Sequence, residues 1–158
     1  MKLKYLFPHR FKKIGWFVLI PTLLAGLSVM YLNFEPDFFN IKVFAILNDG
    51  FLSEGHNFQF ITDNVFNEII GILLIISSLM IAFSRQKEED EFIAKIRLES
   101  LVWATYFNYA VLILTMIFVY GISFFNVMTF NLFTILFFFI IRFNWELLKL
   151  KKAQKNEE

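Results

Sequence analysis

The chain has 158 residues, 58% of them hydrophobic and 20% aromatic, with a formal net charge of +1 and a mean hydropathy of +0.59. This composition is too apolar for a soluble domain of this length, and the length allows only one compact unit. The sequence therefore predicts a single membrane domain over residues 1–158. It contains no cysteine, which excludes disulfides, thiolate chemistry and cysteine-based metal sites.

Four apolar runs are long enough to matter, because a helix needs about 20 mostly apolar residues to cross a hydrocarbon core of roughly 30 Å. They cover residues 14–32, 65–83, 101–120 and 124–141, and only the second contains a charged residue, Glu68 near its start. The predicted fold class is an all-α integral membrane protein, built as a four-helix transmembrane bundle. The connection Gly121–Ser123 is so short that the last two spans must be antiparallel neighbours, and Gly121 can take the left-handed conformation that ends a helix.

The basic residues predict the orientation, because loops rich in Lys and Arg stay on the cytoplasmic side. Five precede the first run, four lie between the second and third, and five follow the fourth, against Lys42 alone between the first and second. We therefore expect cytoplasmic termini, a cytoplasmic loop at 84–100, a cytoplasmic tail at 142–158 and an external loop at 33–64. Trp16, Trp103 and Trp145 agree with this topology, since each falls near the predicted cytoplasmic boundary, where Trp is enriched.

The external loop contains a run rich in β-branched and aromatic residues, then Asn48, Asp49 and Gly50, and then an alternation of polar and aromatic residues. This pattern favours a small β-hairpin; the alternative is an interfacial helix over residues 38–47. An isolated hairpin is marginal in water, so it would have to lean on the membrane surface or on the outer end of the bundle. Asp63 is placed to cap the second span, with Glu68 in its first turns.

The middle of every predicted span lacks ionisable residues, which argues against a proton relay, a charge-coupled transporter or a voltage sensor. Counted inward from the cytoplasmic ends, uncharged polar residues of all four spans fall at a similar depth. This polar layer could be a small-ligand site, or it could supply interhelical hydrogen bonds that hold the bundle together. By the same count Asn131 lies nearer the outer face and is not expected to pair with Asn108. The layer consists of Thr22, Ser77, Ser78, Thr105, Asn108 and Thr134.

The segment "RQKEEDEFIAKIRLES" places many charges between two apolar runs. Glu91, Lys95 and Glu99 are spaced i, i+4 and i+8, in the order that stabilises a helix, while apolar residues fall on another face. The segment therefore predicts an amphipathic helix that runs into the third span. Two interpretations remain open: a solvated joint, or a docking surface for a cytosolic or membrane partner that uses Glu91, Lys95, Arg97 and Glu99.

Nothing in the sequence indicates an enzyme. His9 and His56 are predicted on opposite sides of the membrane, so they cannot share a metal, and neither a phosphate-binding glycine loop nor a nucleophile elbow is present. We expect no catalytic residue, cofactor or bound metal. The expected partners are the lipid bilayer and a protein, with no direct contact to nucleic acid.

The stretch "EEDEFIAKIRLESLVWATYFNYA", residues 88–110, resembles small uncharacterised bacterial inner-membrane proteins with four spans and an acidic cytoplasmic helix before the third. The resemblance implies a multi-pass protein of the bacterial inner membrane, and it carries no catalytic motif. The leading hypothesis is a regulatory or scaffolding protein that engages a partner through its cytoplasmic loop and tail. The alternative is a small transporter or channel subunit whose path is the polar layer.

Overall fold

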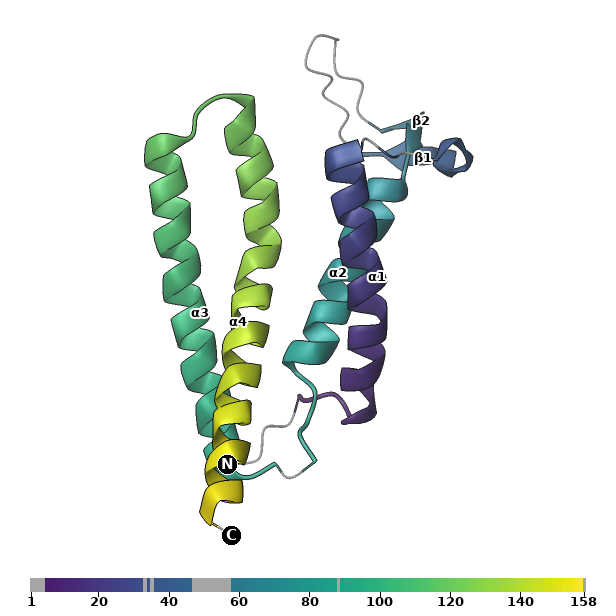
Figure 1. Ribbon diagram of the computed structural model, residues 1–158. Coiled ribbons are helices and arrows are strands. Elements are labelled where there is room, and N and C mark those ends of the chain that lie inside the picture. The colour runs from purple at the N-terminus through teal and green to yellow at the C-terminus, as the bar shows by residue number, and fades with distance from the viewer. Residues whose placement is uncertain (1–4, 33, 35, 47–57, 88, 158) are drawn as a thin grey trace. The chain divides into compact units, whose positions relative to one another are not determined.

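The computed structural model describes residues 5–32, 34, 36–46, 58–87 and 89–157, apart from the side chains of residues 154, 155 and 157. The described part of the chain is mostly helical, with one two-stranded sheet (Figure 1). Two compact units can be distinguished, residues 1–19 with 74–158 and residues 20–73, and each is described separately below. In chain order the elements are α1 (Arg10–Leu32), η1 (Asp37–Phe39), β1 (Asn40–Ala45), β2 (Gln59–Asn64), α2 (Phe66–Ala82), α3 (Glu91–Phe118) and α4 (Ile122–Glu157).

The four expected helices are all present. Three of them, α1, α3 and α4, are long and apolar enough to cross a membrane, which makes the chain a small multi-span membrane protein by helix length and composition. The fourth, α2, is equally apolar but has only 17 residues. At a rise of 1.5 Å per residue it is about 26 Å long, slightly less than a typical hydrocarbon core.

In the first unit, α3 and α4 form an antiparallel pair joined by a tight turn (Figure 1). Gly121 in this turn has a φ of 70°, so the prediction of a left-handed glycine here is confirmed. Both helices continue well beyond their apolar runs at the end away from the turn: α3 begins at Glu91, and α4 reaches Glu157. The amphipathic helix predicted to run into the third span is therefore confirmed as the start of α3.

The core of this unit lies toward that same end of α3 and α4. Phe139 of α4 stacks on Phe143 and also on Phe83, with ring centroids 5.7 Å apart in both pairs. Close helix contact continues at Gly15 of α1, where an added Cβ would lie 2.7 Å from Ile81 Cγ1 of α2. The buried apolar residues are Leu19, Ile81, Ala82, Ile93, Ile96, Ala104, Phe139, Ile140, Phe143 and Leu147.

The second unit contains the β-hairpin, which confirms the strand interpretation of the external loop over the interfacial helix. β1 pairs with β2 antiparallel, from Asn40 opposite Asn64 to Ala45 opposite Gln59. The predicted turn at Asn48–Gly50 lies outside the described residues. The hairpin is tied to the start of α2, since Phe39 lies 4.8 Å from Phe66 between ring centroids.

The cap of α2 differs from the prediction. Asn64 Oδ1, and not Asp63, accepts the Phe66 amide at 3.1 Å, and the Asn64 side chain also donates to the carbonyl of Pro36. Asp63 belongs to β2, where its carboxylate accepts the amide of Asn64. β2 runs through Asp63 to Asn64, so the Asn64 side chain is the one that reaches the start of α2.

Candidate functional site

The charged segment between α2 and α3, which we call the joint, makes well-defined contacts through its described residues, 83–87 and 89–90. α2 ends at Ala82, and α3 begins after Asp90, whose carboxylate accepts the Ile93 amide at 2.7 Å as an N-cap. Within the joint, Glu89 accepts the backbone amide of Gln86 at 2.7 Å. These local bonds hold the joint in a compact turn, so its position relative to α3 is fixed.

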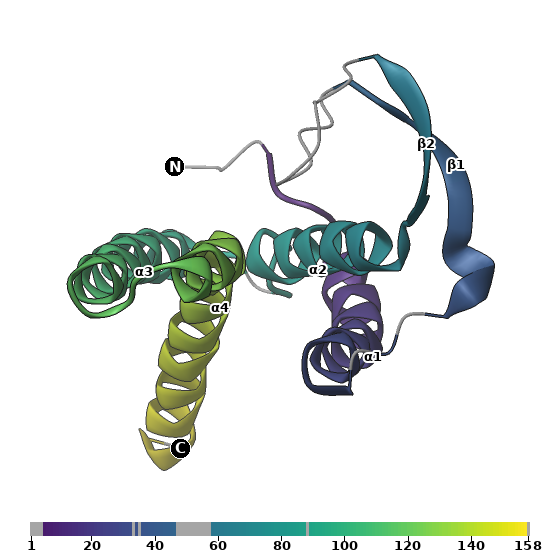
Figure 2. The same cartoon turned by 90° about the horizontal axis from the view of Figure 1, so that it is seen from above.

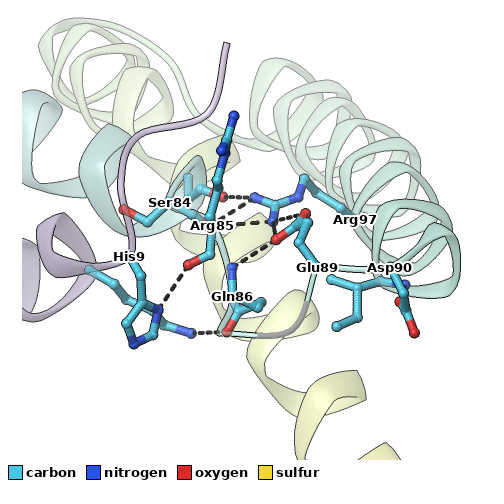
Figure 3. Close-up of polar contacts among 10 residues, drawn as sticks. His9, Ser84, Arg85, Gln86, Glu89, Asp90 and Arg97 are labelled. Atoms are coloured by element: carbon cyan, nitrogen blue, oxygen red, sulfur yellow. Dashed lines mark hydrogen bonds and ion pairs between the residues drawn. The ribbon is translucent and has the colours of Figure 1, made fainter. Parts of the chain in front are cut away.

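Arg97 is the centre of this joint, although it belongs to the second turn of α3 (Figure 3). Its guanidinium donates to the carbonyl oxygens of Ala82 at 3.1 Å and of Ser84 at 3.3 Å. It also forms an ion pair with Glu89 at 2.8 Å, and the two side chains are 6% and 22% exposed. The guanidinium carbon lies 4.7 Å from the centroid of the Phe143 ring on α4. One buried side chain thus links the end of α2, the joint, α3 and α4.

The segment before α1 completes the arrangement. Phe7 pairs with the joint through backbone bonds of 2.9 Å, one to the carbonyl of Phe83 and one from the amide of Arg85. His9 Nδ1 lies 2.9 Å from the Arg85 carbonyl oxygen (Figure 3). These contacts fix the start of α1 against the joint. We call the set Glu89, Arg97, Phe143 and the backbone of residues 82–85 the Arg97 cluster.

Lys12 extends the contacts of the joint from α1 to α4. Its ammonium donates to Gln86 Oε1 at 3.3 Å and to Asn144 Oδ1 at 3.0 Å, two neutral acceptors. It is half-buried and lies within electrostatic reach of two further cations, Lys151 and Arg97. Lys12, Lys151 and Arg97 thus bring several cations close together beside the joint.

The chemistry of the Arg97 cluster is that of a structural link. A cation at the C-terminal end of α2 satisfies carbonyl groups that have no partner within the helix and interacts favourably with the helix dipole. Because Arg97 is buried and its guanidinium already binds Glu89, it does not offer a free cation to a ligand. Among the described residues no group of His, Asp or Glu side chains could hold a metal ion.

The four residues proposed for partner binding separate into two groups. Arg97 faces inward as part of the Arg97 cluster, whereas Glu91, Lys95 and Glu99 are exposed. Lys95 and Glu99 lie 3.9 Å apart as an i, i+4 ion pair. The buried positions of this part of α3, residues 93, 96, 97 and 100, lie on the opposite side of the helix. The exposed surface of α3 therefore carries Glu91, Lys95 and Glu99, and Arg97 is not part of it.

The polar layer is only partly brought together. Asn108 and Asn131 form a reciprocal amide pair, with Nδ2 to Oδ1 distances of 3.4 and 3.3 Å, and the Thr134 hydroxyl also donates to Asn108 Oδ1. Thr105 and Ser77 instead donate to carbonyl oxygens of their own helices, those of Leu101 and Leu74. Ser78 is buried in α2, and Thr22 is buried in the unit of residues 20–73.

The Asn108–Asn131 pair contradicts the expectation that the two side chains lie at different depths. Depth was counted from the charged ends of the spans, which do not define the register of two helices. Counted from the tight turn, Asn108 lies ten residues before Phe118 and Asn131 nine residues after Ile122. The two are then level to within about one residue rise of 1.5 Å. The short connection between α3 and α4 is the sequence signal that places the two asparagines opposite each other.

No protein-family model, curated protein or solved structure matches the chain.

Proposed function

We propose that this protein is a non-enzymatic regulatory or scaffolding protein of a bacterial cytoplasmic membrane, which binds a protein partner through the exposed start of α3 and the end of α4. In this proposal all four helices span the membrane, with both termini in the cytoplasm. The short helix α2 spans together with the flanking Val65 and Phe83, and a mismatch of a few ångströms costs only a modest free energy. The distribution of Lys and Arg supports the orientation.

The observation that carries the proposal is a charged and apolar stripe on the start of α3. We define the α3 stripe as Glu91, Lys95, Leu98, Glu99 and Val102, which are exposed and repeat at the spacing of one helix face. Val102 lies at the start of the third apolar run and can meet lipid, but lipid does not account for the charged part of the stripe, because acidic side chains are unfavourable in hydrocarbon and anionic headgroups repel them. A protein surface of complementary charge would satisfy both the charged side chains and Leu98.

The second support is the rigidity of this surface. The first ten residues of α3 extend about 15 Å beyond the start of the apolar run at Leu101. The Arg97 cluster holds this extension from its opposite face, and Asp90 caps it. A partner that binds a pre-formed helix does not have to order it, and this saves conformational entropy on binding.

The end of α4 supplies the rest of the proposed surface. α4 continues as a helix to Glu157, and Glu146 bridges Arg142 at 3.3 Å and Lys149 at 3.4 Å. Arg142 also lies over the Trp103 ring of α3 at 5.3 Å, which ties the two helices together below the stripe. The start of α3 and the end of α4 thus lie at the same end of the α3–α4 pair (Figure 1).

The experiment compares partner recovery from native cells by pull-down in a mild detergent, with bound proteins identified by mass spectrometry. The test variant replaces Glu91, Lys95 and Glu99 with Ala and retains Arg97, so the internal cluster stays intact. A matched control replaces the exposed Arg10, Lys13 and Asp37 with Ala, which changes as many charges away from the stripe and from the end of α4. The proposal requires proteins that the native chain and the control recover and the test variant loses.

A third variant separates charge pattern from helix stability. Glu91→Lys, Lys95→Glu and Glu99→Lys together preserve i, i+4 pairing but invert every charge of the stripe. If this variant and the alanine variant both recover the same proteins as the native chain, the stripe is a solvated face and the proposal is wrong. The transporter alternative is measured separately, as flux into liposomes that Asn108→Leu would abolish.

A further inference from the structure

The β-hairpin presents an aromatic face that the described part of the protein leaves uncovered. Side-chain exposure alternates over residues 42–45 and 59–62, the part of the hairpin further from α2: Val43 and Ala45 of β1 and Gln59 and Ile61 of β2 are half-buried, while their neighbours on the other face are exposed. The exposed face carries Phe44 at 53%, Phe58 at 69% and Phe60 at 74%. Large aromatic side chains exposed together are unusual on a surface that meets only water.

These three phenylalanines form one cluster. Phe44 and Phe60 are directly opposite each other in the register, with ring centroids 5.3 Å apart, and Phe58 lies 6.5 Å from Phe44. Phe58 has a φ of 59°, an unfavourable backbone conformation for an aromatic residue, and its amide donates to the Ile46 carbonyl at 3.1 Å. The backbone thus keeps Phe58 beside the other two rings despite this local cost.

The position of the hairpin on its unit limits what can cover this face. The hairpin is tied to the first residue of α2 through the side chains of Asn64 and Phe39, so it stays at the end of that apolar helix. Figure 2 looks down on that end and shows β1 and β2 lengthwise, whereas Figure 1 shows them foreshortened. The strands therefore run across the direction of α1. They lie beside the end of α2 at which that helix begins.

A hairpin that runs across the end of a membrane helix lies along the membrane surface. Phe side chains on the apolar face of an amphipathic segment favour burial at the boundary between headgroups and acyl chains. Lys42 is exposed on the same face as Phe44, two pairs closer to α2, and its long side chain can reach lipid phosphate while its stem stays among apolar groups. A two-stranded hairpin is marginal in water by itself, and lipid contact would supply the missing support.

We propose that the face carrying Phe44, Phe58 and Phe60 inserts into the interfacial layer of the phospholipid bilayer, with Lys42 on the lipid phosphates. The hairpin is then a membrane-surface anchor that fixes the level of the outer ends of α1 and α2. This inference is independent of the partner-binding surface on α3, because it concerns the opposite side of the membrane in the proposed topology.

The test uses the full chain in vesicles of phosphatidylethanolamine and phosphatidylglycerol. The chain has no cysteine, so Phe60→Cys creates a unique site for an environment-sensitive fluorophore, and Phe58→Cys provides a second. Asp63→Cys, on the other face of β2, is the matched control. Lipids with a spin label near the headgroup should quench the dye at residues 58 and 60, and aqueous iodide should quench it several-fold less than at residue 63.

Two results would overturn the proposal. If iodide quenches all three sites equally, the aromatic face is in water. If residues 58 and 60 are protected from iodide but spin-labelled lipid does not quench them, protein covers the face instead. In that case iodide quenching is repeated at a higher ratio of lipid to protein. Protection that weakens when the protein is diluted in lipid identifies a second copy of the chain as the cover.

Discussion

The Glu89 carboxylate lies 2.8 Å from the guanidinium of Arg97, and Arg97 is the more deeply buried member of the pair. Arg97 has further partners in the carbonyl oxygens of Ala82 and Ser84, whereas its compensating charge comes from Glu89 at the edge of the cluster. Removal of the carboxylate would leave a buried cation, while removal of the arginine would leave a carboxylate that water can reach.

We expect Glu89→Gln to lower the free energy of unfolding by about 3 kcal/mol, because it leaves the buried Arg97 without its counter-charge, and Arg97→Met to lower it by about 2 kcal/mol, because water can reach the remaining carboxylate. The double variant should be less unstable than the sum of the two, with a coupling of about 1–3 kcal/mol. Unfolding in mixed detergent micelles with increasing dodecyl sulfate, followed by circular dichroism, measures all three. Additive effects within about 0.5 kcal/mol would mean that the pair does not stabilise the fold.

Gly15 of α1 packs directly against Ser77 and Ile81 of α2. A Cβ there would lie 2.7 Å from Ile81 Cγ1 and 3.0 Å from the backbone oxygen of Ser77, and the backbone cannot move aside cheaply. Gly15→Ala should therefore destabilise the protein by about 1–3 kcal/mol through overpacking, although alanine is the better helix former. The same micelle unfolding assay measures the change.

Gly121→Ala is the contrasting variant, because a Cβ there meets no atom within 4 Å. Its cost comes from the φ of 70°, so Gly121→Asn, which tolerates the left-handed region, should recover part of the stability. Ile81→Ala should partly rescue Gly15→Ala and should leave Gly121→Ala unchanged. A stable Gly15→Ala variant would show that α1 and α2 are further apart than described.

The Asn108–Asn131 pair predicts a non-additive pair of substitutions within the membrane. Either Asn→Leu change alone should cost about 1–2 kcal/mol, since it leaves one amide without its partner in a weakly polar environment. Replacing both should cost little more than replacing one, because two apolar side chains then face each other. Thr134→Val, which removes the hydroxyl that donates to Asn108, serves as a third measurement in the same unfolding series.

Much of the architecture could be predicted because hydrophobic length and charge distribution act on long segments. The four helices, the glycine turn at Gly121 and the hairpin follow from runs of residues whose pattern needs no knowledge of tertiary contacts. Errors in the role of single residues arose where a shift of one position along the chain changes which side chain makes the contact. Asn64 caps α2 in place of Asp63, because β2 runs through Asp63 and ends at Asn64, next to the helix.

The candidate site was harder to predict because its contacts join distant segments. Arg97 lies two positions from Lys95 and two from Glu99, both exposed, and its charge alone does not distinguish it as the residue that turns inward. Helical periodicity offered one signal: Arg97 follows Ile93 by four positions and precedes Ser100 by three, so it shares their buried face. Its partners Ala82, Ser84 and Phe143 are set by tertiary packing and could not be read from the sequence.

Ser100 provides a prediction of opposite sign. It is buried on the same face of α3 as Arg97, and its hydroxyl has no hydrogen-bond partner among the described residues. A buried hydroxyl without a partner costs about 1–3 kcal/mol in lost hydration, and alanine has the higher helix propensity. Ser100→Ala should therefore leave the free energy of unfolding unchanged or raise it by up to about 1 kcal/mol.

Ser84→Ala is the matched control, because the Ser84 hydroxyl is equally buried but donates to the carbonyl of Met80. It should lower the stability by about 1 kcal/mol, the usual net value of one hydrogen bond. Unfolding both variants in micelles compares the removal of one hydroxyl group at two buried serines, of which only Ser84 has a hydrogen-bond partner. A Ser100→Ala variant as unstable as Ser84→Ala would mean that the Ser100 hydroxyl has a polar partner, such as a bound water molecule beside the Arg97 cluster.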